Sequence, residues 1–165
     1  MQTEDVIALL KIAAIGSCDW TPAQLSLELG HSVAEIEASI KRLTDAQLLR
    51  STFRPDPDSL RKFLLIDLHK RYPVTPGKLT RGILTGAKQA PYFTVGLPYT
   101  SIWVWPKENG PDWGFEIAPL SPHCCFAAVN DKKLRELLAI TETLRVAGQE
   151  ARIWAEYSLK QIGLF

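Results

Sequence analysis

The sequence predicts an α+β fold that is mainly helical, on the basis of three observations. Short amphipathic helical patterns, separated by glycines, occupy residues 4–45. Two runs rich in aromatic residues, 102–105 and 113–117, flank the turn-forming segment 106–110, and a long helical pattern covers 131–163. We therefore expect a winged helix-turn-helix over 1–55, a linking helix, extended segment and β-hairpin region over 56–130, and a C-terminal helix over 131–165.

Length and composition are those of a folded chain. Of the 165 residues, 46% are hydrophobic and 22% charged, so the chain can bury a core without disulfide support. No apolar run approaches the ~18 residues of a membrane-spanning helix, and the acidic start at Glu4 and Asp5 is unlike a signal peptide. Three cysteines, two of them adjacent, make no disulfide framework. We expect a soluble, cytoplasmic protein with no membrane partner.

Charge is unevenly distributed along the chain, although the formal net charge is only +1. Residues 1–49 hold three basic and seven acidic side chains, a net charge of −4, whereas residues 50–88 hold nine basic and three acidic ones, a net charge of +6. A basic centre of this kind is typical of an anion-binding face. Solvated lysines and arginines on ordinary surface give the same pattern, so both interpretations stay open.

The first predicted helix covers residues 4–15. Thr3 can cap its N-terminus, and Glu4 and Asp5 suit the positive end of the helix dipole. Gly16 then ends it, because glycine readily adopts the conformation that terminates a helix.

A tight turn joins the second and third predicted helices. The second helix begins after Thr21, with Pro22 at its first position, and stops at Gly30. The third begins at Ser32, whose hydroxyl forms a capping box with the Glu35 carboxylate. Its buried stripe is expected to consist of Val33, Ile36, Ile40 and Leu43. Two short helices around a glycine turn indicate a helix-turn-helix, although other small helical bundles share the pattern.

A short strand at 51–53 is expected to open a wing after the third helix. A further helix then runs from a cap at Asp58–Ser59 to about Lys70. A wing hairpin that pairs 49–53 with 63–68 competes with this helix. The second of these segments lacks the alternation of a strand, so the helix is favoured.

Residues 73–100 hold four prolines and four glycines and are expected to be largely extended or looped. Aromatic side chains crowd into the end of this segment and the strands that follow it. They are Tyr92, Phe93, Tyr99, Trp103, Trp105, Trp113 and Phe115. Two interpretations stand side by side: a ligand pocket or stacking platform for bases, and the core of a small sheet packed on helices.

The helical pattern over 131–163 would be roughly 45 Å long if it were continuous. A globule of this size does not cover that length along one side, so an apolar face would be left for a second copy of the chain. We therefore expect a homodimer. The alternative is that Gly148 breaks the element into two helices that fold back on each other.

Residues 1–50 resemble the winged helix-turn-helix of MarR-like bacterial transcriptional regulators, through the segments 21–25, 29–32 and 33–43 and the Leu48-Leu49 pair that follows. The remainder is similar to the extension of a poorly characterised group of bacterial winged-helix proteins. The shared marks are Tyr72-Pro73, Leu79–Thr85, Val104-Trp105-Pro106, Ala118-Pro119-Leu120 and Leu137–Ile140 with Leu144-Arg145. The resemblance implies a winged-helix fold and transcriptional regulation through DNA, and the extension implies no activity.

No motif for catalysis, nucleotide binding or metal binding is found in the sequence. It contains no P-loop, no G-x-G-x-x-G and no G-x-S-x-G. His123, Cys124 and Cys125 offer soft ligands, but adjacent side chains diverge, so free cysteines are favoured over a zinc site. We expect no enzyme activity, no cofactor and no bound metal.

DNA contacts are predicted on and after the third helix, where hydroxyl and basic side chains can reach phosphates and base edges. The candidates are Ser32, Ser39, Lys41, Arg42, Arg50, Arg54, Arg61 and Lys62, and Glu35 and Glu37 oppose them. The sequence thus predicts a dimeric transcriptional regulator that binds double-stranded DNA. The alternative is a winged-helix module that binds a protein partner, for which an acidic N-terminal part is expected.

Arg81 lies between Thr80 and Gly82 in the stretch rich in proline and glycine. We predict that this arginine is at least partly buried and bound by a carboxylate or by backbone carbonyls, or that it holds an anion. The alternative is an exposed arginine on a loop.

Overall fold

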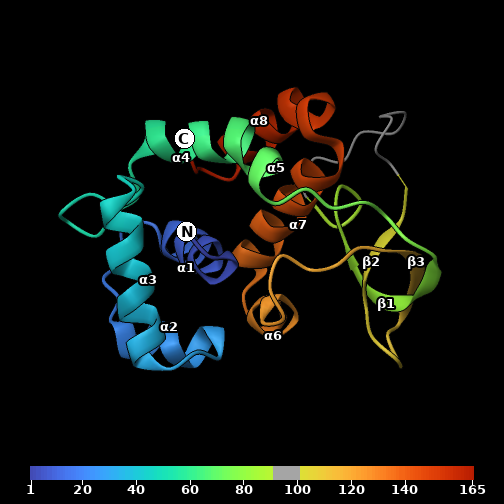
Figure 1. The fold of residues 1–165 in the computed structure, drawn as a ribbon, viewed down its shortest axis with the longest axis horizontal. Coiled ribbons are helices and arrows are strands. Elements are labelled where there is room, and N and C mark those ends of the chain that lie inside the picture. Colours follow the sequence, from blue (N-terminus) through green and yellow to red (C-terminus); the bar gives the residue numbers. More distant parts are fainter. Residues whose placement is uncertain (91–100) are drawn as a thin grey trace.

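The computed structural model describes residues 1–90 and 101–165, and it has the predicted α+β composition (Figure 1). The elements are, in chain order, α1 (Thr3–Ile15), α2 (Pro22–Leu29), α3 (Val33–Asp45), α4 (Pro57–Lys62), a π-helical segment (Phe63–Asp67), α5 (Leu68–Arg71), β1 (Leu79–Thr85), β2 (Trp103–Pro106), β3 (Asp112–Glu116), α6 (Cys124–Val129), α7 (Lys132–Ala147), a 3-10 turn (Gly148–Ala151) and α8 (Arg152–Gln161). Among the described residues, no helix combines the length and the apolar character needed to cross a lipid bilayer.

The first three helices form where the sequence predicts them. The Thr21 hydroxyl accepts a hydrogen bond from the backbone N–H of Gln24, and Gly30 ends α2 with a φ of 71°. The capping box at the start of α3 is also present. At α1 the predicted cap is wrong: Thr3 is the first helical residue, and Asp5 accepts a hydrogen bond from the backbone N–H of Gln2.

The buried stripe of α3 differs from the predicted one by one position. Ile36, Ile40 and Leu43 are buried, but Val33 is 42% exposed, and Ser39 is buried instead. Ser39 lies three residues after Ile36 and therefore on the same side of the helix.

The segment after α3 forms a turn, and the predicted strand at 51–53 is wrong. Leu49 makes one antiparallel bridge to Pro55, and the residues between them form the turn. Pro55 has no N–H with which to continue a ladder. The favoured linking helix is confirmed as α4, the π-helical segment and α5, which excludes the hairpin of 49–53 with 63–68. Asp56 caps it through the N–H of Ser59, so the predicted cap at Asp58–Ser59 is wrong.

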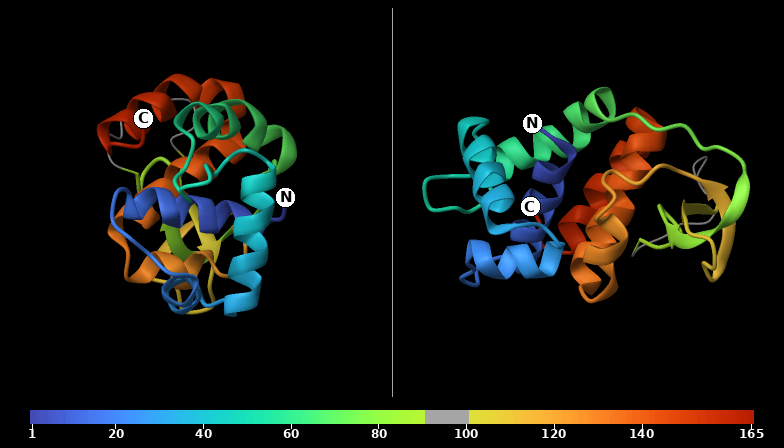
Figure 2. Two further views of the ribbon diagram at one scale, coloured as in Figure 1. Left: turned by 90° about the vertical axis from the view of Figure 1, so that its left-hand side faces the viewer. Right: turned by 60° about the horizontal axis from the view of Figure 1, so that its bottom comes forward.

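Helix α7 is the long C-terminal helix and the centre of the molecule. Figures 1 and 2 show helices α1–α4 on one side of it and the strands on the other. It contacts α1, α5, α6, α8 and β1, and its residues from Leu137 to Arg145 are buried. Gly148 ends α7 with a φ of 54°, and α8 then packs back on α7. The alternative with a break at Gly148 is therefore confirmed, and the continuous helix over 131–163 is wrong.

The three strands form a small closed barrel. β1 pairs antiparallel with both other strands, its second half with β2 and its first half with β3, and Gly82 is common to both. β2 and β3 run parallel where Trp103 meets Phe115, which closes the barrel. The predicted strands at 102–105 and 113–117 are confirmed, but the hairpin between them is wrong. β1 lies within residues 73–100, which were predicted to be largely extended or looped, and it was not predicted as a strand of the sheet.

Gly82 is the point at which β1 passes from one partner strand to the other. It lies opposite Pro106, the last residue of β2, and opposite Asp112, the first residue of β3. A Cβ on Gly82 would collide with the carbonyl oxygen of Trp105, and a Cβ on Gly110 would collide with the backbone of Gly82. Because neither position carries a side chain, the loop after β2 passes close to β1 at Gly82. The next strand, β3, then runs in the same direction as β2 along the first half of β1, instead of forming a hairpin with β2.

A buried polar cluster joins the barrel to α7. The Glu142 carboxylate accepts hydrogen bonds from Trp105 Nε1 at 3.2 Å, from the backbone N–H of Leu120 at 2.9 Å and from Arg145 Nη1 at 2.6 Å. Arg145 also donates to the carbonyl oxygen of Tyr72 at 2.8 Å. Burial raises the pKa of Glu142, and the three donors act against that shift by stabilising the carboxylate.

The described aromatic residues of the barrel divide into a buried pair on β2 and an exposed pair on β3. Trp103 and Trp105 are 3% and 1% exposed and belong to the core, whereas Trp113 and Phe115 are 57% and 45% exposed. Tyr92, Phe93 and Tyr99 lie outside the described residues. The core interpretation therefore holds for the two tryptophans of β2 and not for the aromatic residues of β3.

Candidate interface on and around α3

The predicted DNA contacts do not form a free basic surface. The Ser32 hydroxyl is held in the capping box of α3. Ser39 is only 2% exposed, and its hydroxyl accepts a hydrogen bond from Arg42 at 3.1 Å, so it has no access to a ligand outside the chain. Within the described part of the chain, Lys41 and Lys62 are the candidates with exposed side chains and no hydrogen bond or ion pair.

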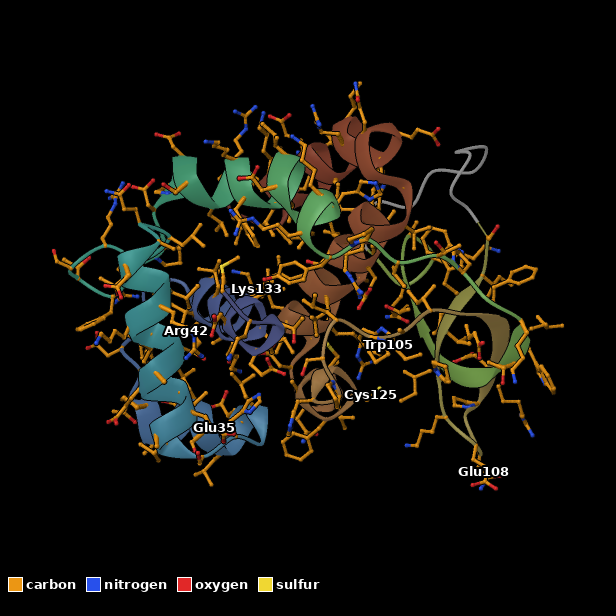
Figure 3. The ribbon with its side chains drawn as sticks, viewed as in Figure 1. Glu35, Arg42, Trp105, Glu108, Cys125 and Lys133 are labelled. Atoms are coloured by element: carbon orange, nitrogen blue, oxygen red, sulfur yellow. The ribbon has the colours of Figure 1, made fainter. Side chains whose placement is uncertain are left out.

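Arg42 lies on the side of α3 that faces α1 (Figure 3). Its Nε and Nη2 atoms donate to both carboxylate oxygens of the buried Asp5, at 2.6 to 3.0 Å. Burial acts to raise the pKa of Asp5, but the hydrogen bonds from Arg42, from the Gln2 N–H and from Ser39 outweigh it, and the pKa lies below its ordinary value. This pair fixes α3 against α1.

Arg54 holds the loop that follows α1. Its guanidinium donates to the carbonyl oxygens of Gly16, of Ser17 at 2.6 Å and of Cys18 at 3.0 Å. These bonds tie the turn after α3 to the loop before α2. Arg54 therefore has a structural role that its predicted role as a DNA contact did not include.

Arg50 and Arg61 lie in exposed ion pairs. Arg50 pairs with Asp56 at 2.9 Å and Arg61 with Glu156 at 2.6 Å, and the two arginine side chains are 58% and 50% exposed. Surface pairs of this kind contribute little to stability, so both arginines can exchange their carboxylate for another anion.

The accessible face of α3 is acidic. Its exposed charged side chains are those of Glu35, Glu37, Lys41 and Asp45, and the charge of Arg42 is neutralised by Asp5. Carboxylates dominate this face, which opposes the phosphate contacts on which DNA affinity depends.

A cavity of about 460 Å³ opens beside this face. Its walls come from the loop before α2, from α3 and from the turn between Leu49 and Pro55. Trp20, Ile40 and Phe53 supply apolar walls. The charged lining consists of Asp19, Glu37 and Arg54, and Arg54 pairs with Asp19 at 3.4 Å. A volume of this size is typical of sites that hold a ligand or an anchoring side chain.

Phe53 occupies an unfavourable backbone conformation at this cavity. Its φ is 56°, in the left-handed region, which costs a residue with a side chain roughly 1 kcal/mol. The ring is nevertheless 51% exposed, and it meets Trp20 edge to face with 6.3 Å between the centroids. Strain that positions an exposed aromatic ring beside a cavity is a feature of binding sites.

Trp20 and Phe53 are site residues that the sequence did not predict. Trp20 directly precedes the Thr21 cap of α2, where a packed apolar residue is ordinary. The left-handed conformation of Phe53 has no sequence signal, because it depends on Arg54 and the bridge at Leu49.

Arg81 is exposed, so the prediction that it is partly buried is wrong. It lies on the outer face of β1, where its Cζ atom is 5.7 Å from the ring centroid of Trp113. The alternation of β1 accounts for this position, because Arg81 precedes Gly82, which faces inward.

The soft ligands near α6 do not form a metal site. The rings of His31 and His123 lie 4.1 Å apart, and burial together with His123 lowers the pKa of His31. Cys124 is buried, which raises the pKa of its thiol and keeps it protonated. In residues 1–90 and 101–165 no three histidine, cysteine or carboxylate side chains are placed to hold a metal ion.

Comparison with known proteins finds no counterpart: no family model, no curated protein and no solved structure matches the chain.

Proposed function

We propose that α1–α3 and the turn between Leu49 and Pro55 form a winged-helix module that binds a protein segment. The observation that carries this proposal is the chemistry of the accessible surface around α3. It offers an apolar, aromatic cavity flanked by carboxylates, while Arg42 and Arg54 are held within the chain. This arrangement favours the protein-binding module over the DNA-binding regulator.

The preferred segment carries a large apolar side chain next to a lysine or arginine. The apolar side chain fills the space between Trp20, Ile40 and Phe53, and the cation meets Glu37, because Asp19 is paired with Arg54. An anchor of this kind supplies affinity through burial, and the charge pair supplies orientation.

A peptide library displayed on phage and selected on the whole chain tests this proposal. We expect enrichment of motifs that join a large apolar residue to a basic one. For a synthetic peptide with the enriched motif, Phe53→Gly and Glu37→Gln should each weaken binding about tenfold, roughly 1.4 kcal/mol. Glycine accepts the left-handed conformation, so Phe53→Gly should keep the fold.

Two matched controls lie outside the cavity, on α8 and on the 3-10 turn before it. Ile153→Ala removes an apolar side chain that is 86% exposed, and Glu150→Gln removes an exposed carboxylate, and neither should change peptide binding. Enriched peptides that bind Phe53→Gly and Glu37→Gln as tightly as the original chain would contradict the proposal.

The DNA-binding regulator is the second candidate, and the observation in its favour is a set of exposed basic side chains on α3, α4 and α5. Lys41 and Lys62 are exposed, and Lys70 and Arg71 continue the same charge along α5. If this candidate is right, duplex DNA binds with a steep salt dependence that Lys41→Ala reduces. The expected homodimer belongs to this candidate, because paired half-sites require two copies.

A further inference from the structure

A second exposed surface lies on the barrel, on the outer face shared by β1 and β3. In the register of these strands, Leu79 lies opposite Phe115 and Arg81 opposite Trp113. Residues directly opposite each other in an antiparallel pair point to the same side of the sheet, so the four side chains form one patch. Leu79, Trp113 and Phe115 are 59%, 57% and 45% exposed.

These outer side chains are not needed for the core of the barrel. The barrel already packs on the core of the molecule through Trp103 and Trp105, which are almost completely buried, and Trp105 bonds to Glu142 of α7. Large apolar side chains that gather on a surface without supporting a core mark a binding site.

Cations surround this patch. A hollow of about 550 Å³ beside Trp113 is lined by Lys78, Arg81 and Lys107, and Glu108 is the one carboxylate in its described lining. Figure 3 shows Glu108 at the tip of the barrel, away from the helices. The hollow is therefore positively charged next to the exposed ring of Trp113, over which the Arg81 guanidinium lies, and this combination suits an aromatic ligand that carries negative charge.

We propose that this outer face of β1 and β3 binds single-stranded nucleic acid. A base stacks on the exposed ring of Trp113, and the neighbouring phosphates contact Lys78, Arg81 and Lys107. Phe115 lies two residues further along β3, about 7 Å away, and offers a second ring for the next base. An unpaired strand is required because the bases of a duplex keep their faces stacked on each other.

This site is independent of the protein-binding module. It lies across α7 from α3 (Figure 1), and it uses stacking and phosphate contacts instead of an apolar anchor. Phe53→Gly should leave nucleic-acid binding unchanged, so the failure of either proposal can be recognised without the other.

Fluorescence anisotropy of the whole chain with a labelled oligo(dT) of about 12 nucleotides tests the proposal. The matched probes are an abasic oligomer of the same length, which has phosphates without bases, and a duplex. We expect oligo(dT) to bind at least about fivefold more tightly than the abasic oligomer, because stacking on one ring contributes that much.

Variants then locate the site. Trp113→Ala should weaken oligo(dT) binding at least about fivefold, whereas Trp113→Phe, which keeps a ring, should stay within about twofold. Lys78→Ala combined with Lys107→Ala should flatten the salt dependence. The control Lys132→Ala removes a lysine that is 91% exposed on α7 and should change neither value. Thermal unfolding should confirm that the Trp113 variants remain folded, since this side chain is exposed.

Equal binding of oligo(dT) and the abasic oligomer, or equal binding by Trp113→Ala and the original chain, would overturn the proposal. Absence of oligonucleotide binding would also overturn it. If the chain then self-associates in sedimentation and Trp113→Ala abolishes that association, the face is a protein contact instead.

Discussion

Arg42 of α3 holds the buried carboxylate of Asp5 in α1 with hydrogen bonds of 2.6 to 3.0 Å from two guanidinium nitrogens. The bidentate geometry neutralises a charge that is fully removed from water. A DNA phosphate that recruited Arg42 would leave Asp5 buried without its counterion. The arginine best placed to strengthen a recognition helix is therefore occupied by the fold itself.

Loss of Arg42 should destabilise the protein. Arg42→Ala should lower the free energy of unfolding by about 2 kcal/mol or more, because a buried carboxylate loses charge-assisted hydrogen bonds. The neighbouring Lys41→Ala removes an exposed cation and should stay within about 0.5 kcal/mol. Urea unfolding measures both. Equal stabilities would contradict the assigned role of Arg42, and DNA-binding tests should use Lys41→Ala alone.

Acid should weaken the same contact. The pKa of Asp5 is lower in the folded chain than the ordinary value of about 3.9, since the hydrogen bonds from Arg42 and others outweigh burial. A lowered carboxylate pKa adds stability above the unfolded-state pKa, and that stability is lost as the pH falls through the folded-state pKa. The stability difference between the original chain and Asp5→Asn should therefore be constant near neutral pH and shrink below about pH 4. A difference independent of pH would show that Asp5 is not ionised in the fold.

Glu142 should be essential for attaching the barrel to α7. Glu142→Ala leaves Arg145 buried without its carboxylate and should cost about 3–5 kcal/mol. The double variant Glu142→Leu with Arg145→Met replaces the pair by apolar side chains and should be more stable than Glu142→Ala. Calorimetry compares the three proteins. A double variant less stable than Glu142→Ala would mean that the bonds from Arg145 to backbone carbonyls matter more than the pair.

The barrel should not tolerate a side chain at Gly82. Gly82→Ala pushes a methyl group into the Trp105 carbonyl oxygen and should cost about 1–3 kcal/mol. Thr80→Ala in the same strand shortens a side chain and creates no collision of this kind, so it serves as the control. Near-ultraviolet circular dichroism should show a changed tryptophan environment in Gly82→Ala, because the added methyl group displaces the backbone of the buried Trp105. An unchanged spectrum and stability would refute the close approach.

The homodimer prediction is tested at an exposed apolar residue of α8, because Leu134, Leu137, Leu138 and Leu144 of α7 are buried. Leu144 is 2% exposed, so Leu144→Asp should unfold the chain whatever its oligomeric state. Ile153 on α8 is 86% exposed, and Ile153→Asp should keep the fold. If α8 forms a dimer contact, sedimentation equilibrium should show dimers for the original chain and monomers for Ile153→Asp. Dimers in both proteins would place the contact elsewhere.

Much of the candidate site could not be predicted from the sequence. The position of α3, its capping box and its acidic residues were predictable, because they depend on local spacing. The pairing of Arg42 with Asp5 and the hold of Arg54 on the loop after α1 join residues 37 and 38 positions apart. From the sequence alone, these arginines are candidate DNA contacts. Only the tertiary structure shows that their guanidinium groups are bound within the chain.

The sequence by itself determined the helices α1–α3, the linking helix and two of the three strands, because caps, glycine stops and the 3.6-residue period act within a few residues. Only the tertiary structure decided that α7 ends at Gly148, that β2 and β3 run parallel, and that Trp113 is exposed while Trp105 is buried. The reason is physical: each outcome depends on contacts between distant segments, such as the close approach of Gly82 to Gly110 and the bond from Trp105 to Glu142. Such contacts exist once the elements have packed, and local spacing carries no record of them.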